Sequence, residues 1–125
     1  MNPLSSKIIT GTTGELLVQL RLFQYGVQAS APLADSGNDL IGVKGDVFKA
    51  IQVKTTAVDG SFISPENRMY HILAFVKLDG EGDELKLDRC QIFLIPKEIV
   101  ESEDFNKNQI DRFCLNADLV DELFN

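Results

Sequence analysis

The stretch that decides the fold is residues 39–56, which read DLIGVKGDVFKAIQVKTT. Its two apolar runs, 39–43 and 47–55, are rich in β-branched residues and are typical of strands. Gly45-Asp46 lies between them and suits a two-residue hairpin turn. We therefore predict an antiparallel β-hairpin in this part of the chain.

The turn also fixes the register of the predicted hairpin. Lys44 pairs with Val47, and counting outward along both strands places Asp39 opposite Gln52. Side chains alternate along a strand, so Lys54 points to the same face as Gln52. Opposed Cβ atoms lie roughly 4.5–5.5 Å apart and diagonal ones about 7–8 Å apart. We therefore expect an acid, an amide and a lysine to converge at one end of an otherwise apolar face.

A helical pattern precedes the hairpin and ends near Tyr25, before Gly26. Two glycines weaken its first half, so its predicted first residue lies between positions 5 and 12. The residues that form its apolar face at helical spacing are Leu16, Leu17, Leu20 and Phe23. Glu15 lies on the same predicted helix.

The remaining patterns alternate between strands, loops and short helices. They predict an edge strand at 27–32, a loop at 34–38, a loop at 57–68, a strand at 70–78, a turn at 79–83, a central strand at 90–95 and a short helix at 97–101. A C-terminal helix capped by Asn116 or Asp118 carries the apolar stripe Leu119, Val120, Leu123 and Phe124. The order predicts an α/β (α+β) domain built on one mixed sheet.

Length and composition narrow the class of protein. The 125 residues are enough for one domain, 1–125, but not for two. No stretch approaches the roughly 20 apolar residues of a membrane span, and no secretion signal is expected. Cys90, Cys114 and the lone His71 lack the spacing of a zinc site. We expect reduced thiols, a cytoplasmic location and no catalytic role for His71.

The charge is unevenly distributed. The chain carries −7 overall, with +1 on residues 1–56 and −8 on residues 57–125. Nucleic-acid binding depends on basic residues that neutralise phosphates, so an acidic protein does not achieve it by charge alone. Any phosphate-facing surface should therefore lie in the first half and depend on metal ions.

The convergent polar residues suit a hard divalent cation, which prefers carboxylate, amide and carbonyl oxygens. Asp39 would supply the charged ligand, with the Gln52 amide oxygen and the Val53 carbonyl as further ligands. Glu15 would reach the ion from the helix, directly or through water. Lys54 would stabilise a pentavalent phosphate or orient the attacking water.

Each of these residues also has a non-catalytic explanation. Residues 12–15, Thr-Thr-Gly-Glu, fit a capping box in which Glu15 only caps a helix. Asp39 would then be a turn residue after Gly-Asn. Gln52 and Lys54 would lie on the solvated face of an edge strand.

Three runs of sequence resemble the PD-(D/E)XK nuclease superfamily. They are GTTGE at 11–15, GNDLI at 37–41 and IQVKT at 51–55. The similarity is greatest to small branches related to archaeal Holliday-junction resolvases and to some intron homing endonucleases, and it covers residues 8–56. It implies a restriction-endonuclease-like core in the order α-β-β-β-α-β. It also implies magnesium-dependent cleavage of DNA phosphodiesters, with manganese able to substitute.

The resemblance assigns a role to each position that matches the family motif. Glu15 matches the helix glutamate, Asp39 the metal-binding aspartate and Lys54 the catalytic lysine. Gln52 stands where most members have Glu or Asp, so the site has one negative charge fewer. Two further departures are Asn38, where the motif has proline, and the loop at 57–68, where the core often has a helix.

Three functions follow from these patterns. The first is a metal-dependent DNA endonuclease, with Thr55 and Thr56 donating hydrogen bonds to a neighbouring phosphate and branched DNA as the first substrate to test. The second is a catalytically inactive nuclease-fold module that binds DNA or a partner protein. The third is an interaction domain that docks through the C-terminal stripe at 119–124. That stripe is expected in the core, with closure of a homodimer or larger complex as the alternative.

Overall fold

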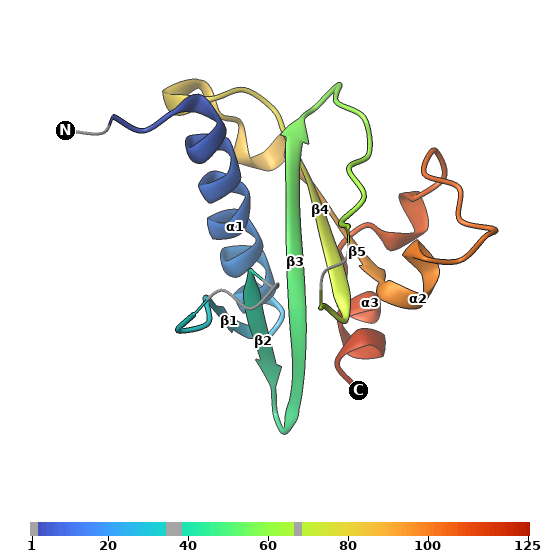
Figure 1. The fold of residues 1–125 in the computed structure, drawn as a ribbon. Helices are drawn as coiled ribbons and strands as arrows, with labels where there is room; N and C mark the ends of the chain where they lie inside the picture. Colours follow the sequence, from blue (N-terminus) through green and yellow to red (C-terminus); the bar gives the residue numbers. More distant parts are fainter. Residues whose placement is uncertain (1–2, 35–38, 67–68) are drawn as a thin grey trace.

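The computed structural model describes residues 3–34, 39–66 and 69–125. Its centre is one five-stranded sheet in the order β1-β2-β3-β4-β5 (Figure 1). The strands are β1 Gln28–Ser30, β2 Leu40–Lys44, β3 Val47–Ala57, β4 Ile72–Leu78 and β5 Gln91–Pro96. The α-helices are α1 Ser6–Gln24, α2 Lys97–Val100 and α3 Ala117–Leu123. Neighbouring strands pair antiparallel except β3 and β4, which are parallel. This arrangement confirms the predicted mixed sheet.

The two faces of the sheet are covered by different elements. Buried residues of α1 and α3 pack with one set of strand side chains. On the opposite face, α2 and residues 105–113 pack with the other set, centred on Phe75 and Phe93. The sheet therefore has one hydrophobic core on each side.

The β2–β3 hairpin has the predicted turn and register. Lys44 pairs with Val47 and Leu40 with Ile51, and Gly45 has the positive φ of 63° that this turn requires. One step beyond the ladder, the Asp39 N–H donates to the Ile51 carbonyl at 3.0 Å. Regular pairing therefore ends at Leu40 and Ile51, and Asp39 is held beside β3 by a bond that is one residue out of register.

Helix α1 begins early and runs through both glycines of its first half. Ser5 is the N-cap, and its hydroxyl accepts a hydrogen bond from the Ile8 N–H at 3.2 Å. Glu15 is therefore in the middle of the helix, and the capping-box explanation for it is wrong.

The predicted apolar face of α1 is wrong, except at Leu17. Leu16, Leu20 and Phe23 are exposed. The buried residues of the helix are Gly14, Leu17, Val18 and Leu22. The sheet packs against this second stripe because Gly14 lets the helix approach β3 closely. A Cβ atom on Gly14 would lie 1.8 Å from the Thr55 Oγ1.

Strand β5 is an edge strand, so the prediction that it is central is wrong. Its sequence reads as central because four of its residues, Ile92–Ile95, are buried under elements on both faces. The C-terminal segment also covers part of its outer edge. Cys114 forms a bridge with Phe93, and the Leu115 N–H donates to the Ile92 carbonyl at 2.9 Å.

The segment that joins β3 to β4 contains no helix in its described parts, 58–66 and 69–71. The loop predicted at 57–68 therefore agrees with the structure over residues 58–66, whereas residue 57 is the last residue of β3. The helix that the family resemblance implies at this point is absent there. The Phe62 ring packs 5.0 Å from the Phe75 ring, centroid to centroid. The loop thus helps to cover the face where a crossover helix would pack.

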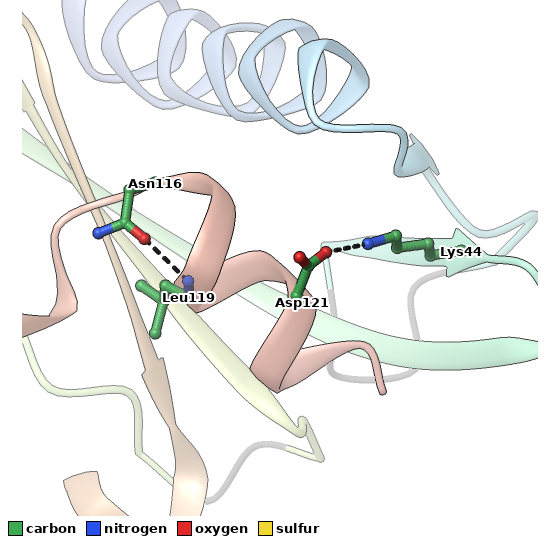
Figure 2. A network of polar contacts seen from close by, with 4 residues as sticks. All are labelled: Lys44, Asn116, Leu119 and Asp121. Atoms are coloured by element: carbon green, nitrogen blue, oxygen red, sulfur yellow. Dashed lines mark hydrogen bonds and ion pairs between the residues drawn. The ribbon is translucent and has the colours of Figure 1, made fainter.

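Helix α3 begins at its predicted cap and is tied to the hairpin (Figure 2). The Asn116 side chain accepts a hydrogen bond from the Leu119 N–H at 2.8 Å, and Asp121 pairs with Lys44 of β2 at 2.5 Å. Leu119, Val120 and Phe124 are buried in the core. The stripe is therefore not a free docking surface, and neither a partner nor a second copy can use it in this form.

No helix in the described part of the chain has the length and apolar character needed to cross a membrane.

Candidate active site

The candidate site lies where β2 ends and β3 continues with β4 as its only strand partner (Figure 1). The β2–β3 ladder stops at Leu40 and Ile51, so the remaining residues of β3 have an open edge on that side. Asp39 sits at the boundary. Its Oδ2 accepts hydrogen bonds from the Val53 N–H at 2.8 Å and from the Gln52 Nε2 at 2.9 Å. Asp39 and Gln52, which the sequence predicted to converge, are thus in direct contact.

Gln52 is the buried polar side chain of this site, with 4 % of its surface exposed. Its Nε2 is the atom that faces Asp39, because an ionised carboxylate only accepts hydrogen bonds. Its Oε1 is buried and has no hydrogen-bond partner among the described residues. A buried amide oxygen without a partner costs roughly 1–3 kcal/mol. The solvated-edge explanation for Gln52 is therefore wrong.

Val53 adds a third oxygen at the same edge. In a β-strand, the N–H and C=O of one residue point to the same side. The Val53 N–H points to Asp39, so its carbonyl faces the open edge too. The Asp39 carboxylate and the Val53 carbonyl therefore lie at this edge, and the Gln52 amide contacts the same carboxylate through its Nε2.

A cavity of about 690 Å³ joins these groups to the rest of the predicted site. Its lining includes every predicted catalytic, metal-binding and phosphate-binding residue, namely Glu15, Asp39, Gln52, Val53, Lys54, Thr55 and Thr56. The sequence therefore predicted which residues meet, although their roles stay predictions.

The cavity wraps around the open edge of β3. Ile51 and Val53 pack on the α1 side of the sheet, so Gln52 and Lys54 point to the other face. Glu15 approaches from α1, on the Val53 side. The close contact between Gly14 and Thr55 fixes how near α1 comes to β3, and therefore how near Glu15 lies to the edge.

Sequence patterns missed several residues of the cavity. These are Ser6, Lys7, Thr10, Gly11, Ala57 and Ile63. Lys7, Gly11 and Glu15 follow one another at intervals of four, so they share one side of a helix. The earliest predicted start of the helix, at position 5, already allowed this spacing, so it was a signal that could have found Lys7 and Gly11.

The oxygen donors of the site suit a hard cation. Carboxylate, amide and carbonyl oxygens are ligands for magnesium, manganese or calcium, whereas zinc favours Cys and His. Among the described residues, no group of three or more His, Cys, Asp or Glu side chains could hold a metal. An ion at this site would therefore depend partly on the neutral oxygens of Gln52 and Val53.

Comparisons with known proteins identify a fold. No family model matches the chain, and no curated protein matches it. A solved structure, described as that of the bacterial homing endonuclease I-Ssp6803I, is similar with a TM-score of 0.59 at 13 % sequence identity. The match covers 88 % of this chain and 86 % of that one. The chain therefore has a nuclease-like fold, a mixed five-stranded sheet with flanking helices.

Proposed function

We propose that this chain is a metal-dependent endonuclease of the PD-(D/E)XK superfamily that hydrolyses DNA phosphodiester bonds. The observation that carries the proposal is the buried, unpartnered Gln52 Oε1 beside Asp39. A buried polar atom without a partner is rare in native proteins, and a bound ion is one of the explanations that it calls for. The nuclease-like fold supports the same activity.

In this proposal, Asp39, Gln52 and Val53 hold a magnesium or manganese ion, and Glu15 contributes from α1 directly or through water. When bound, the ion would supply Lewis-acid activation of the phosphate and would lower the pKa of a bound water. The Gln52 Nε2 keeps its hydrogen bond to the Asp39 Oδ2, so the ligands are oriented before the ion arrives. The amide carries no charge, so we expect weaker metal binding than with Glu at this position.

Lys54 and the two threonines act on the phosphate. Lys54 stabilises the negative charge that develops on the phosphoryl oxygens, or orients the attacking water. Thr56 points to the same face as Lys54 because they are two residues apart on β3. Thr55 points to the α1 side and packs against Gly14. Thr56 packs against a glycine in the same way, since a Cβ atom on Gly60 would lie 1.8 Å from its Oγ1. Both threonines line the cavity, so each is placed to donate a hydrogen bond to a phosphate.

A second candidate function is a catalytically inactive module that binds DNA or a partner protein on the same fold. It is favoured by the amide at Gln52, which leaves the site with one carboxylate fewer than most members of the superfamily that the sequence resembles. The two functions differ in metal binding, because an intact site binds magnesium or manganese and a degenerate one does not.

The test is cleavage of labelled four-way-junction, duplex and flapped DNA in magnesium and in manganese. We expect metal-dependent cleavage, and we expect Lys54→Ala to reduce it by roughly 100-fold or more, as for loss of a group that stabilises transition-state charge. Lys49→Ala is the matched control, because Lys49 is on the same strand but outside the cavity. If the folded wild type cleaves no DNA in either metal, the proposed endonuclease activity is overturned and the inactive module is favoured.

A further inference from the structure

We propose that Lys7 and Gly11 of α1 form a track for the DNA backbone, in which Lys7 binds a phosphate upstream or downstream of the cleaved one. This inference rests on the proposed function and extends it to how the substrate lies in the cavity. The track is the row Lys7, Gly11 and Glu15, which lines the cavity that holds Asp39 and Gln52.

Gly11 has no packing reason to be glycine. A Cβ atom built on it meets no atom within 4 Å, whereas the same atom on Gly14 would clash with Thr55. Glycine in a helix interior is less stable than alanine because it loses more backbone entropy on folding. A glycine that costs stability, packs against nothing and lines a cavity is the residue expected where a ligand must approach the helix backbone closely.

Lys7 supplies a cation at the outer end of the row. Among the described residues, ion pairs join Lys44 to Asp121 and Lys97 to Glu101, so Lys7 is in neither. Lys7 and Lys54 balance the charges of Glu15 and Asp39 within the cavity. A bound divalent cation would therefore make the cavity positive, although the whole chain carries −7.

The spacing along α1 fits a polynucleotide strand. Lys7 and Glu15 are eight residues apart, which is a rise of about 12 Å. One strand of a DNA duplex advances about 3.4 Å along the axis for each phosphate. The row is therefore long enough for Lys7 to meet a different phosphate from the one that is cleaved. Gly11, halfway between, leaves room for the intervening backbone.

The test measures DNA affinity by fluorescence anisotropy over a range of salt concentrations, with the full chain and labelled duplex and junction DNA. We expect Lys7→Ala to weaken binding roughly ten-fold, as for loss of one charge-assisted hydrogen bond. The slope of log affinity against log salt should become shallower by about 0.9. Lys49→Ala is the control, since Lys49 is five residues from Lys54 along β3, about 17 Å.

The role of Gly11 is tested with substitutions that should raise the stability of the protein and weaken its binding to DNA. Gly11→Ala should raise the Tm by about 4 °C and still weaken DNA binding. Gly11→Leu should weaken binding at least as much as Lys7→Ala. Gly14→Ala is the contrasting variant, because its added methyl clashes with Thr55 and should lower the Tm.

Two outcomes would overturn the track alone: Gly11→Leu with wild-type affinity, or Lys7→Ala with the same affinity and salt slope as Lys49→Ala. Wild-type protein that binds DNA but does not cleave it would overturn the catalytic proposal and leave the track standing. Wild-type protein that binds no DNA in either metal would overturn both.

Discussion

Two neighbouring strands of the same sheet, β4 and β3, differ in whether they bury polar side-chain atoms. In β4, Leu73, Ala74, Phe75 and Val76 are all fully buried and wholly apolar in their side chains. In β3, Gln52 pairs in register with Leu73, yet it buries an oxygen that no described residue satisfies. β4 therefore contributes stability by apolar burial, whereas this part of β3 gives up stability by burying a polar atom without a described partner.

The largest expected effect is on the free energy of unfolding, and it comes from a substitution in the apolar strand β4. Phe75→Ala removes a ring that packs against Phe62 and Phe93. We expect the free energy of unfolding to fall by about 3–5 kcal/mol, measured by urea denaturation. Phe48→Ala is the control, since Phe48 is 65 % exposed on β3 and should cost far less. Equal losses for the two variants would contradict the assignment of the core.

A smaller effect on stability, with a large effect on activity, is expected at Gln52. Gln52→Met keeps the size of the side chain and removes both the hydrogen bond to Asp39 and the unpartnered oxygen. Because these changes oppose each other, the free energy of unfolding should change by less than about 1 kcal/mol. Stabilisation by added magnesium or manganese, measured as a shift in Tm, should disappear together with cleavage.

Gln52→Glu is the matched variant for that measurement. It restores a carboxylate and should increase the metal-induced shift in Tm, since the ligands then carry one more negative charge. A Gln52→Met variant that retains both the metal-induced shift and cleavage would show that the amide oxygen is not a ligand.

The smallest effect concerns Tyr70, which has the other buried polar atom without a described partner. Burial raises the pKa of the Tyr70 hydroxyl above 10.0, and the negative charge of Glu101 raises it further. The unfolded chain ionises this group first, so its contribution to stability is present below pH 10 and is lost as pH rises toward the folded pKa. Tyr70→Phe should be less sensitive to pH above 10 than the wild type, measured by urea denaturation.

Tyr25→Phe is the control variant for the measurement on Tyr70→Phe. Tyr25 lies on the other side of the sheet, packed against the α1 core. At neutral pH, Tyr70→Phe should leave cleavage unchanged, in contrast to Gln52→Met. If Tyr70→Phe abolished cleavage, the unpartnered hydroxyl would belong to the functional surface and not to the core.

The parts of the site that the sequence predicted depend on local interactions. Gly45 with Asp46 sets a two-residue turn, the turn sets the register, and the register puts Asp39 beside Gln52. Each step involves residues close in the chain, so the local geometry of the backbone is enough to predict it. The cap of α3 at Asn116 is local in the same sense. Asn38, the departure from the family motif, lies outside the described residues.

The parts that the sequence did not predict depend on contacts between distant segments. Helix α1 has two apolar stripes, and the choice between them is made by the fit of Gly14 against Thr55, 41 positions along the chain. The sequence of β5 does not indicate an edge strand, because residues 114–115 and the elements on both faces of the sheet bury this strand.

The sequence by itself determined the hairpin, its register and the residues that meet at its open end, because a tight turn leaves the two strands one pairing. Only the tertiary structure decided that Gln52 is buried with a free oxygen and that Lys7 and Gly11 join the cavity. Those properties depend on how closely a helix and a sheet approach each other, and that distance is set by side-chain packing between segments far apart in the chain.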